Sequence, residues 1–192
     1  MKKTTLLGVM AFLCQTLTAQ KNTLSPLLVG ERIPDITFHH IINYSADTAS
    51  LSQFQKNDAK LVLLDFWNTQ CLPCIRSFGK LNALQQQYGH QLQIILVTSE
   101  GPAAVRKTLA NWEAANRQKL NVPVIIKDSL LSKFIRRRYN PHYAWVAPDG
   151  MLLAQTSATF VTEEVVAAYL RTMLADAEQR GYKKQELKAN QN

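Results

Sequence analysis

Leu61-Val62-Leu63-Leu64-Asp65-Phe66-Trp67-Asn68-Thr69-Gln70-Cys71-Leu72-Pro73-Cys74 is the stretch that decides the fold. Residues 61–67 form a near-continuous apolar run, which predicts a central strand covered on both faces. From about Cys71 to Tyr88, apolar residues recur every three positions, which predicts a helix with one buried face. A buried strand is therefore expected to lead directly into a helix that begins with two cysteines.

Strands and helices are also expected to alternate on both sides of this stretch. Upstream, the sequence predicts a strand over 36–42, a turn over 45–50 and a helical turn over 51–54. Downstream, it predicts strands over 92–98 and 122–127, helices over 102–118, 129–138 and 162–180, and a hairpin of 144–147 with 151–155. This order predicts an α/β protein with a central mixed β-sheet flanked by helices on both faces.

The N-terminus has the layout of a secretory signal peptide. Lys2 and Lys3 precede an apolar run over 6–13, and Ala19 is a small residue after which a peptidase could cut. The run is too short for a membrane-spanning helix, and the charged flank favours a signal over a buried N-terminal helix. Cys14 as a lipid anchor is disfavoured, because bulky Leu13 precedes it.

The chain is accordingly divided into four parts. They are a signal peptide (1–19), a linker (20–27), a folded domain (28–175) and a polar C-terminal tail (176–192). Secretion across the inner membrane, to a periplasmic location, is expected, and membrane association only through an uncleaved or lipidated N-terminus. The net charge is +8, and +6 without Lys2 and Lys3 (20 basic minus 14 acidic). An exported protein rarely meets nucleic acid, so this charge is interpreted as solvated surface.

Cys71 and Cys74 are the only cysteines that remain after loss of Cys14 with the signal. A Cys-x-x-Cys pair is either a redox couple or half of a zinc site. Structural zinc needs four ligands, and neither further cysteines nor suitably spaced histidines are present, so no metal or other cofactor is expected. At a helix N-terminus a Cys71 thiolate is stabilised by the dipole, and Cys74, one turn deeper, can resolve its mixed disulfides.

Asp65 lies inside the apolar strand, six positions before Cys71. Burial there should raise the pKa of its carboxyl group, which could then exchange a proton with Cys74. The alternative is a structural aspartate that is hydrogen-bonded to the backbone.

Residues 64–74 resemble the thioredoxin superfamily, in particular the TlpA-like exported thiol–disulfide oxidoreductases. The similarity lies in the pattern strand–Trp–x–x–x–Cys–x–x–Cys, with Asp65 at the family's buried carboxylate, and it extends over roughly residues 28–175. The resemblance implies a thioredoxin-like fold. It also implies that Pro141 is a cis-proline opposite the cysteines and that the Asn140 backbone pairs with a substrate strand. Trp67 is expected mainly to pack, in support of the cysteine pair at the substrate site.

Three positions, Gln70, Leu72 and His142, depart from the family pattern. Gln70 stands where an aromatic residue is common, and Leu72-Pro73 replaces the usual Gly-Pro. His142 either tunes the Cys71 thiolate or faces solvent. Residues 136–138, three arginines, either steer substrates or form a solvated helix end.

The predicted function is disulfide exchange with cysteines of exported proteins through Cys71 and Cys74. An unidentified redox partner would recycle the pair, and the protein is expected to be a monomer. Two alternatives are a peroxiredoxin-like thiol peroxidase, whose usual Pro, Thr and Cys spacing is absent, and a copper-binding assembly factor. The copper ligands would be Cys71, Cys74 and His142.

Overall fold

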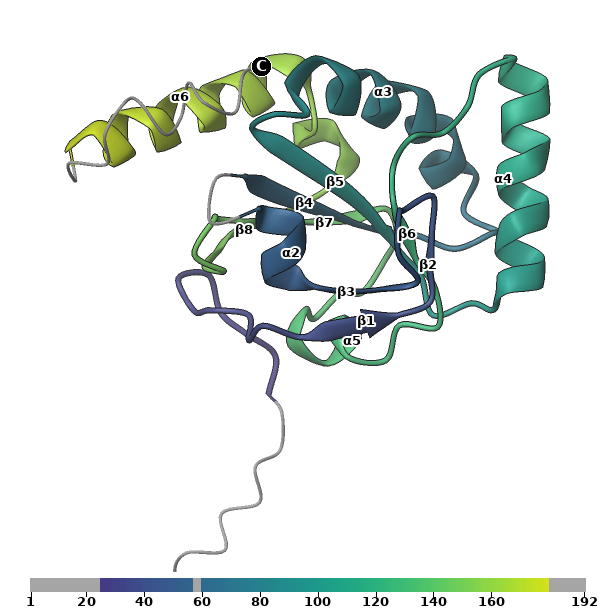
Figure 1. Ribbon diagram of the computed structural model, residues 1–192, viewed down its shortest axis with the longest axis horizontal. Helices are drawn as coiled ribbons and strands as arrows, with labels where there is room; N and C mark the ends of the chain where they lie inside the picture. Colours follow the sequence, from purple (N-terminus) through teal and green to yellow (C-terminus); the bar gives the residue numbers. More distant parts are fainter. Residues whose placement is uncertain (1–24, 57–59, 180–192) are drawn as a thin grey trace, which may run out of the picture.

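A computed structural model describes residues 25–56 and 60–179 of the chain. A six-stranded mixed sheet forms its centre, with the strand order β2-β6-β5-β4-β7-β8 (Figure 1). These strands span Ile41–Ile42 (β2), Val124–Ile125 (β6), Leu92–Val97 (β5), Leu61–Phe66 (β4), His142–Val146 (β7) and Leu152–Thr156 (β8). The predicted signal peptide and most of the predicted tail lie outside the described residues.

Strand β4 is the centre of the sheet, as its apolar sequence predicts. It runs parallel to β5 and antiparallel to β7, and all six of its residues are buried. Because side chains alternate along a strand, Leu61 and Leu63 face one side of the sheet and Val62 and Leu64 the other. Each such side chain contributes about 1.5–3 kcal/mol through burial, so β4 is a rigid support for whatever follows it.

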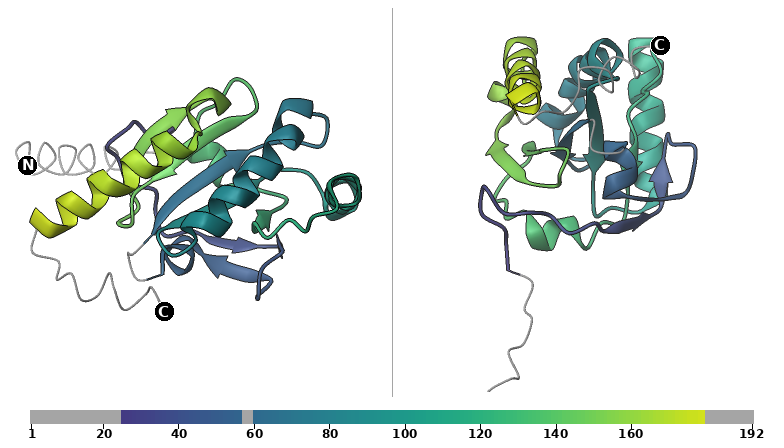
Figure 2. Two further views of the ribbon diagram at one scale, coloured as in Figure 1. Left: turned by 90° about the horizontal axis from the view of Figure 1, so that it is seen from above. Right: turned by 60° about the vertical axis from the view of Figure 1, so that its left-hand side comes forward.

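Helices cover both faces of the sheet, which confirms the predicted fold class. One face packs against α3 (Leu72–Tyr88), α4 (Pro102–Asn116) and α6 (Glu163–Gln179). The other packs against α2 (Leu51–Gln55), α5 (Leu131–Phe134) and a two-stranded sheet of β1 (Thr37–His39) with β3 (Thr48–Ser50). Figure 2 shows these two layers on either side of the strands, and a short 3-10 helix, η2 (Ala158–Phe160), precedes α6.

The upstream region differs from its prediction. The single strand expected over 36–42 is two strands, because His40 has a positive φ of 90° and turns the chain between β1 and β2. The turn expected over 45–50 contains strand β3, whose Ala49 is buried opposite Phe38. The small residues of β3 allow this close antiparallel pairing, and their polar composition concealed it.

The helix predicted over 129–138 is only one turn long. The Asp128 carboxylate accepts hydrogen bonds from the N–H groups of Leu130, Leu131 and Ser132, which starts α5. The helix then ends at Phe134, because Ile135 has an extended backbone. Residues 136–138 are therefore an irregular segment, and the prediction that the three arginines form a helix end is wrong.

Candidate active site

Cys71 and Cys74 form a disulfide at the N-terminus of α3, with their Cα atoms 5.3 Å apart. Cys71 is the N-cap residue, and its Sγ accepts a hydrogen bond of 3.3 Å from the N–H of Cys74. Pro73 occupies the first turn, where its missing N–H costs no hydrogen bond. The strand β4 and the helix α3 thus place the pair as the sequence predicts.

The two sulfur atoms lie in different environments. Cys71 is half-buried and borders an open groove, whereas Cys74 is fully buried in the core beneath α3. Because the Cys74 N–H donates to the Cys71 sulfur and the helix dipole favours negative charge at this end, the Cys71 thiolate is stabilised when the disulfide opens. Only Cys71 can therefore be reached by the sulfur of another molecule.

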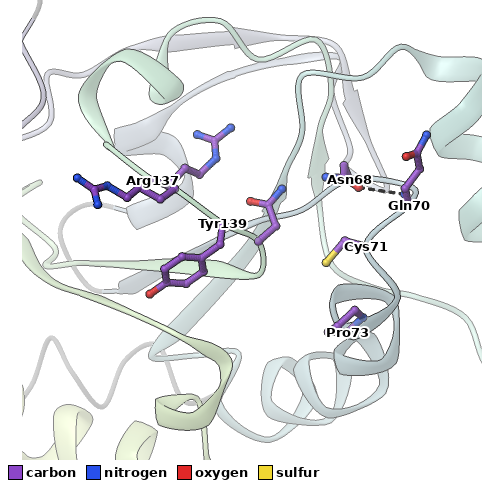
Figure 3. Close-up of a pocket in the computed structure, with 8 residues that line it drawn as sticks. Asn68, Gln70, Cys71, Pro73, Arg137 and Tyr139 are labelled. Atoms are coloured by element: carbon purple, nitrogen blue, oxygen red, sulfur yellow. Dashed lines mark hydrogen bonds between the residues drawn. The ribbon is translucent and has the colours of Figure 1, made fainter.

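The groove beside Cys71 has a volume of about 590 Å³. One side consists of Asn68, Gln70, Cys71 and Pro73, and the other of Arg137, Arg138, Tyr139 and Asn140. Figure 3 shows the Cys71 sulfur pointing into the space between the two sides. Residues from two distant parts of the chain therefore share one opening.

Thr69 and Asn68 hold the loop that leads from β4 to Cys71. The Thr69 N–H and hydroxyl group donate to the Glu100 carboxylate at 2.6 and 2.8 Å. The Asn68 Oδ1 accepts from the N–H of Gln70 at 3.0 Å. Sequence reasoning missed Glu100, since only the parallel pairing of β4 with β5 brings the ends of these strands together.

The Asn140–Pro141 peptide bond is cis, as the resemblance implies. The Asn140 side-chain amide lies 3.2 Å from the carbonyl oxygen of Phe66 and 3.1 Å from Asn68 Nδ2, so it ties the two sides of the groove together. Among the described residues, no backbone group is hydrogen-bonded to the main chain of Asn140. Its N–H and C=O groups are therefore unpaired within the described residues, and pairing with a substrate strand is the role that the resemblance implies. That role remains a prediction.

Asp65 is fully buried on the face of the sheet that Cys74 and α3 cover. It lies between Leu63 and Trp67 on that face and pairs across the strands with Tyr143. Within residues 25–56 and 60–179, both carboxylate oxygens lack a hydrogen-bond partner, because the backbone groups around them are used in the β-sheet. The alternative of a backbone-bonded aspartate is therefore wrong.

Burial raises the pKa of Asp65 well above its ordinary value, and Lys80 on α3 offsets this in part by attracting the carboxylate. Lys80 itself is shifted downward in pKa, first by burial, which the attraction of Asp65 opposes. A carboxyl group of this kind holds a proton at higher pH than usual and can release it to a nearby thiolate.

Trp67 packs rather than lining the groove. It is 2% exposed, and its ring meets Phe78 edge-on with centroids 5.0 Å apart. Its indole nitrogen is buried without a partner. The ring fixes the end of β4 against α3 and so supports the position of both cysteines, as expected from the sequence.

His142 is buried, so the alternative that it faces solvent is wrong. Alternation along β7 turns it to the same side as Phe66, away from α3, and its Nε2 lies 2.9 Å from Gln155 Oε1. Burial lowers its pKa, which the Gln155 bond opposes and Arg137 reinforces. The described part of the chain contains no group of three or more His, Cys, Asp or Glu side chains suited to a metal ion, so the three proposed copper ligands do not form one.

Fold and site together define a protein of the thioredoxin-like fold with a disulfide-forming Cys-x-x-Cys pair at a helix N-terminus. Its sequence is 28% identical over 97 residues to the thioredoxin-like protein YneN of Bacillus subtilis. The match spans 50% of this chain and only 52% of that relative. No protein-family model matches the chain.

Solved structures with the same fold include the following three proteins. A candidate thiol:disulfide interchange protein DsbE of Chlorobium tepidum has a TM-score of 0.59 and 20% identity, covering 75% of this chain and 99% of that one. The thioredoxin domain of a thiol-disulfide oxidoreductase of Bacteroides vulgatus has a TM-score of 0.56 and 19% identity, covering 77% and 99%. The exposed lipoprotein thioredoxin of Streptococcus pneumoniae has a TM-score of 0.55 and 21% identity, covering 72% and 98%. These neighbours show that the chain has a thioredoxin-like fold.

Proposed function

We propose that this protein is an exported thiol–disulfide oxidoreductase that exchanges disulfides with cysteines of partner proteins. The observation that carries the proposal is the asymmetry of the pair, in which Cys71 borders a groove and Cys74 is fully buried. An accessible nucleophile with a buried resolving thiol is the arrangement that two-step exchange requires.

The reductive direction has two steps. The Cys71 thiolate attacks one sulfur of a partner disulfide, forms a mixed disulfide and releases the other partner sulfur as a thiolate. Cys74 then loses its proton and attacks Cys71 Sγ, which closes the Cys71–Cys74 disulfide and releases the second partner sulfur. Two electrons pass from the pair to the partner, and the oxidative direction is the reverse.

In the second step the proton of Cys74 needs an acceptor inside the protein. Asp65 lies on the same face of the sheet, and burial raises the pKa of its carboxyl group, which favours a role in taking up and returning a proton. During both steps a partner segment would lie along the open main chain of Asn140, a form of strand addition that gives affinity with little side-chain specificity.

Replacing Cys74 by serine tests the exchange directly. The Cys74→Ser variant of the full chain should accumulate mixed disulfides that a reductant releases, because Cys71 attacks but nothing resolves the product. Cys71→Ser is the matched control and should trap nothing. Absence of any Cys71-linked partner, or equal trapping by the two variants, would contradict the proposal.

Export is proposed from the residues of the N-terminus. Lys2, Lys3, the apolar run over 6–13 and Ala19 have the order of a signal peptide. Among the described residues, no helix is both long and apolar enough to cross a membrane. The intact mass of the protein recovered from fractionated cells should correspond to a chain that begins at Gln20. A chain that still begins at Met1 would count against cleavage.

A further inference from the structure

We propose that the groove beside Cys71 selects partner segments that carry an acidic residue close to the reacting cysteine, and that Arg138 recognises this carboxylate. The inference rests on the proposed function, because it names the substrate class of the same site. Its basis is the charge of the groove and the bonding of the charged groups around it.

The side chains that line the groove include two arginines and no acidic residue. The remaining lining residues are uncharged apart from the ionisable Cys71 and Tyr139. A concave surface with charge of one sign concentrates ligands of the opposite sign and raises their rate of encounter. The opening through which Cys71 is reached is therefore positively charged.

Two carboxylates whose hydrogen-bond partners lie next to the two sides of the groove, Asp128 and Glu100, are already bonded. Asp128 accepts from three backbone N–H groups and from the hydroxyl of Ser132 at 2.6 Å. Glu100 accepts from the N–H and hydroxyl of Thr69. Among the described residues, neither forms an ion pair with an arginine of the groove. Asp128 attracts Arg137 without forming such a pair, whereas Arg138 has no acidic partner in the described part of the chain.

The two arginines differ in what holds them. Arg137 is half-buried, its guanidinium lies 4.5 Å from the centroid of the Phe66 ring, and both terminal nitrogens donate to Ser132. Arg138 is exposed, and among the described residues it forms neither an ion pair nor a side-chain hydrogen bond. Arg137 therefore shapes the wall, whereas Arg138 keeps all its donors for a ligand.

The position of Arg138 favours a polypeptide over a small thiol. Arg138 precedes Asn140 by two residues, and the main chain of Asn140 is unpaired within the described residues. A segment that pairs with Asn140 and presents its cysteine to Cys71 has neighbouring side chains within reach of Arg138. A carboxylate there would meet a guanidinium that binds it through two parallel hydrogen bonds.

The test compares symmetric peptide disulfides that differ in one residue. The full chain is reduced with dithiothreitol, freed of reductant and mixed with homodimers of a single-cysteine peptide that carries Asp, Asn or Lys two positions from the cysteine. Acid-quenched chromatography measures the released peptide thiol. Each rate is divided by the rate of the same peptide with dithiothreitol, because neighbouring charge also alters the peptide thiol.

The Asp peptide should react about tenfold faster than the Lys peptide at low salt, and this ratio should fall at high salt. In Arg138→Gln the ratio should fall by about three- to fivefold. Arg136→Gln removes the same charge from an exposed position outside the groove and should leave the ratio unchanged.

Three results would overturn the inference. Equal normalised rates for all peptides would show that the groove does not read charge, while leaving the exchange activity intact. An equal fall in Arg136→Gln would assign the effect to net charge rather than to the groove. A stronger Arg138 dependence with glutathione disulfide than with the Asp peptide would make small anionic thiols the substrate. If no disulfide oxidises the pair, the proposed function itself fails.

Discussion

The region around Asp65 and the region around Asp128 each bury a carboxylate, with residue exposures of 0% and 8%. The Asp128 oxygens accept four hydrogen bonds, three of them from the backbone that begins α5. Neither Asp65 oxygen has a hydrogen-bond partner among the described residues. The same domain thus contains one buried carboxylate with hydrogen-bond partners, Asp128, and one without, Asp65.

This difference separates a structural role from a chemical one. Burying a charge without partners costs free energy, so an unbonded acid stays protonated to higher pH, whereas hydrogen bonds from N–H groups favour the charged form. Asp128 stabilises a turn that carries one wall of the groove. Asp65 forms no hydrogen bond among the described residues that would stabilise the fold. It lies on the face of the sheet that Cys74 covers, which is the reason to assign it a role in proton transfer.

The largest expected effect is the loss of stability in Asp128→Ala. The N–H groups of Leu130, Leu131 and Ser132 would lose their acceptor, which should lower the free energy of unfolding by about 3 kcal/mol. Urea denaturation of the oxidised full chain measures this. Asp128→Asn keeps one acceptor oxygen and should lose about half as much. A loss below about 1 kcal/mol would show that these bonds are weak, and the contrast with Asp65 would fail.

The second prediction concerns the rate at which Asp65→Asn resolves a mixed disulfide. An amide cannot take the Cys74 proton, so decay of the mixed disulfide should slow about a hundredfold, which corresponds to about 2.7 kcal/mol of activation free energy. Rapid acid quenching of the reaction with a peptide disulfide at pH 7 measures formation and decay separately.

Asp149→Asn is the control for this measurement, since Asp149 is paired with Arg32 far along the chain from the cysteines. Formation of the mixed disulfide should change less than its decay in Asp65→Asn. Equal slowing of both steps would assign Asp65 to the conformation of the helix terminus rather than to proton transfer.

The Asp65 region was largely predictable from the sequence. The apolar run 61–67 predicts a buried strand, and the acid inside it is therefore expected to be buried as well. The two cysteines that follow, at the start of a helix, predict the redox pair. Each of these predictions depends only on the local sequence. Whether Asp65 has hydrogen-bond partners was left open by the sequence, which also allowed a backbone-bonded aspartate. The cis peptide before Pro141 came from the family resemblance and not from spacing.

The Asp128 region was not predicted, because its structure depends on contacts between distant residues. The apolar and basic pattern of 129–138 fits a helix, but Arg137 packs on Phe66 and Ile135 is extended. Neither the contact of Arg137 with Phe66 nor the extended backbone of Ile135 can be predicted from the local sequence.

The groove was predicted only in part. The family resemblance implied that Asn140 and Pro141 lie opposite the cysteines, but the lining by Arg137 and Tyr139 depends on the pairing of β4 with β7, which joins segments about seventy positions apart.

A third prediction uses the dependence of stability on pH. The raised pKa of Asp65 means that the folded protein binds a proton that the unfolded chain has lost, at every pH between 3.8 and the raised value. Stability attributable to Asp65 therefore falls as pH rises through that interval. Asp65→Asn should remove this fall and should exceed the wild type by about 1.5 kcal/mol at pH 8, because a neutral amide costs less to bury than a carboxylate. Urea denaturation between pH 4 and pH 8 checks it, and identical slopes for both proteins would contradict it.

The smallest expected effect is that of Tyr143→Phe, which sharpens the comparison by testing whether a hydroxyl next to Asp65 belongs to its chemistry. The Tyr143 hydroxyl donates to Ser77 Oγ at 3.3 Å, and Ser77 donates in turn to the carbonyl oxygen of Cys74 at 2.6 Å. Burial raises the pKa of Tyr143, with Asp65 adding to the shift, so this hydroxyl stays neutral and is not a proton source at working pH.

Removing the Tyr143 hydroxyl should lower the free energy of unfolding by about 0.5–1 kcal/mol, since the ring remains packed and the Ser77 bond to Cys74 persists. The decay of the mixed disulfide should change less than twofold, against the hundredfold expected for Asp65→Asn. If Tyr143→Phe slowed that decay as much as Asp65→Asn does, the proton would travel through Tyr143 and Ser77 rather than pass directly between Cys74 and Asp65.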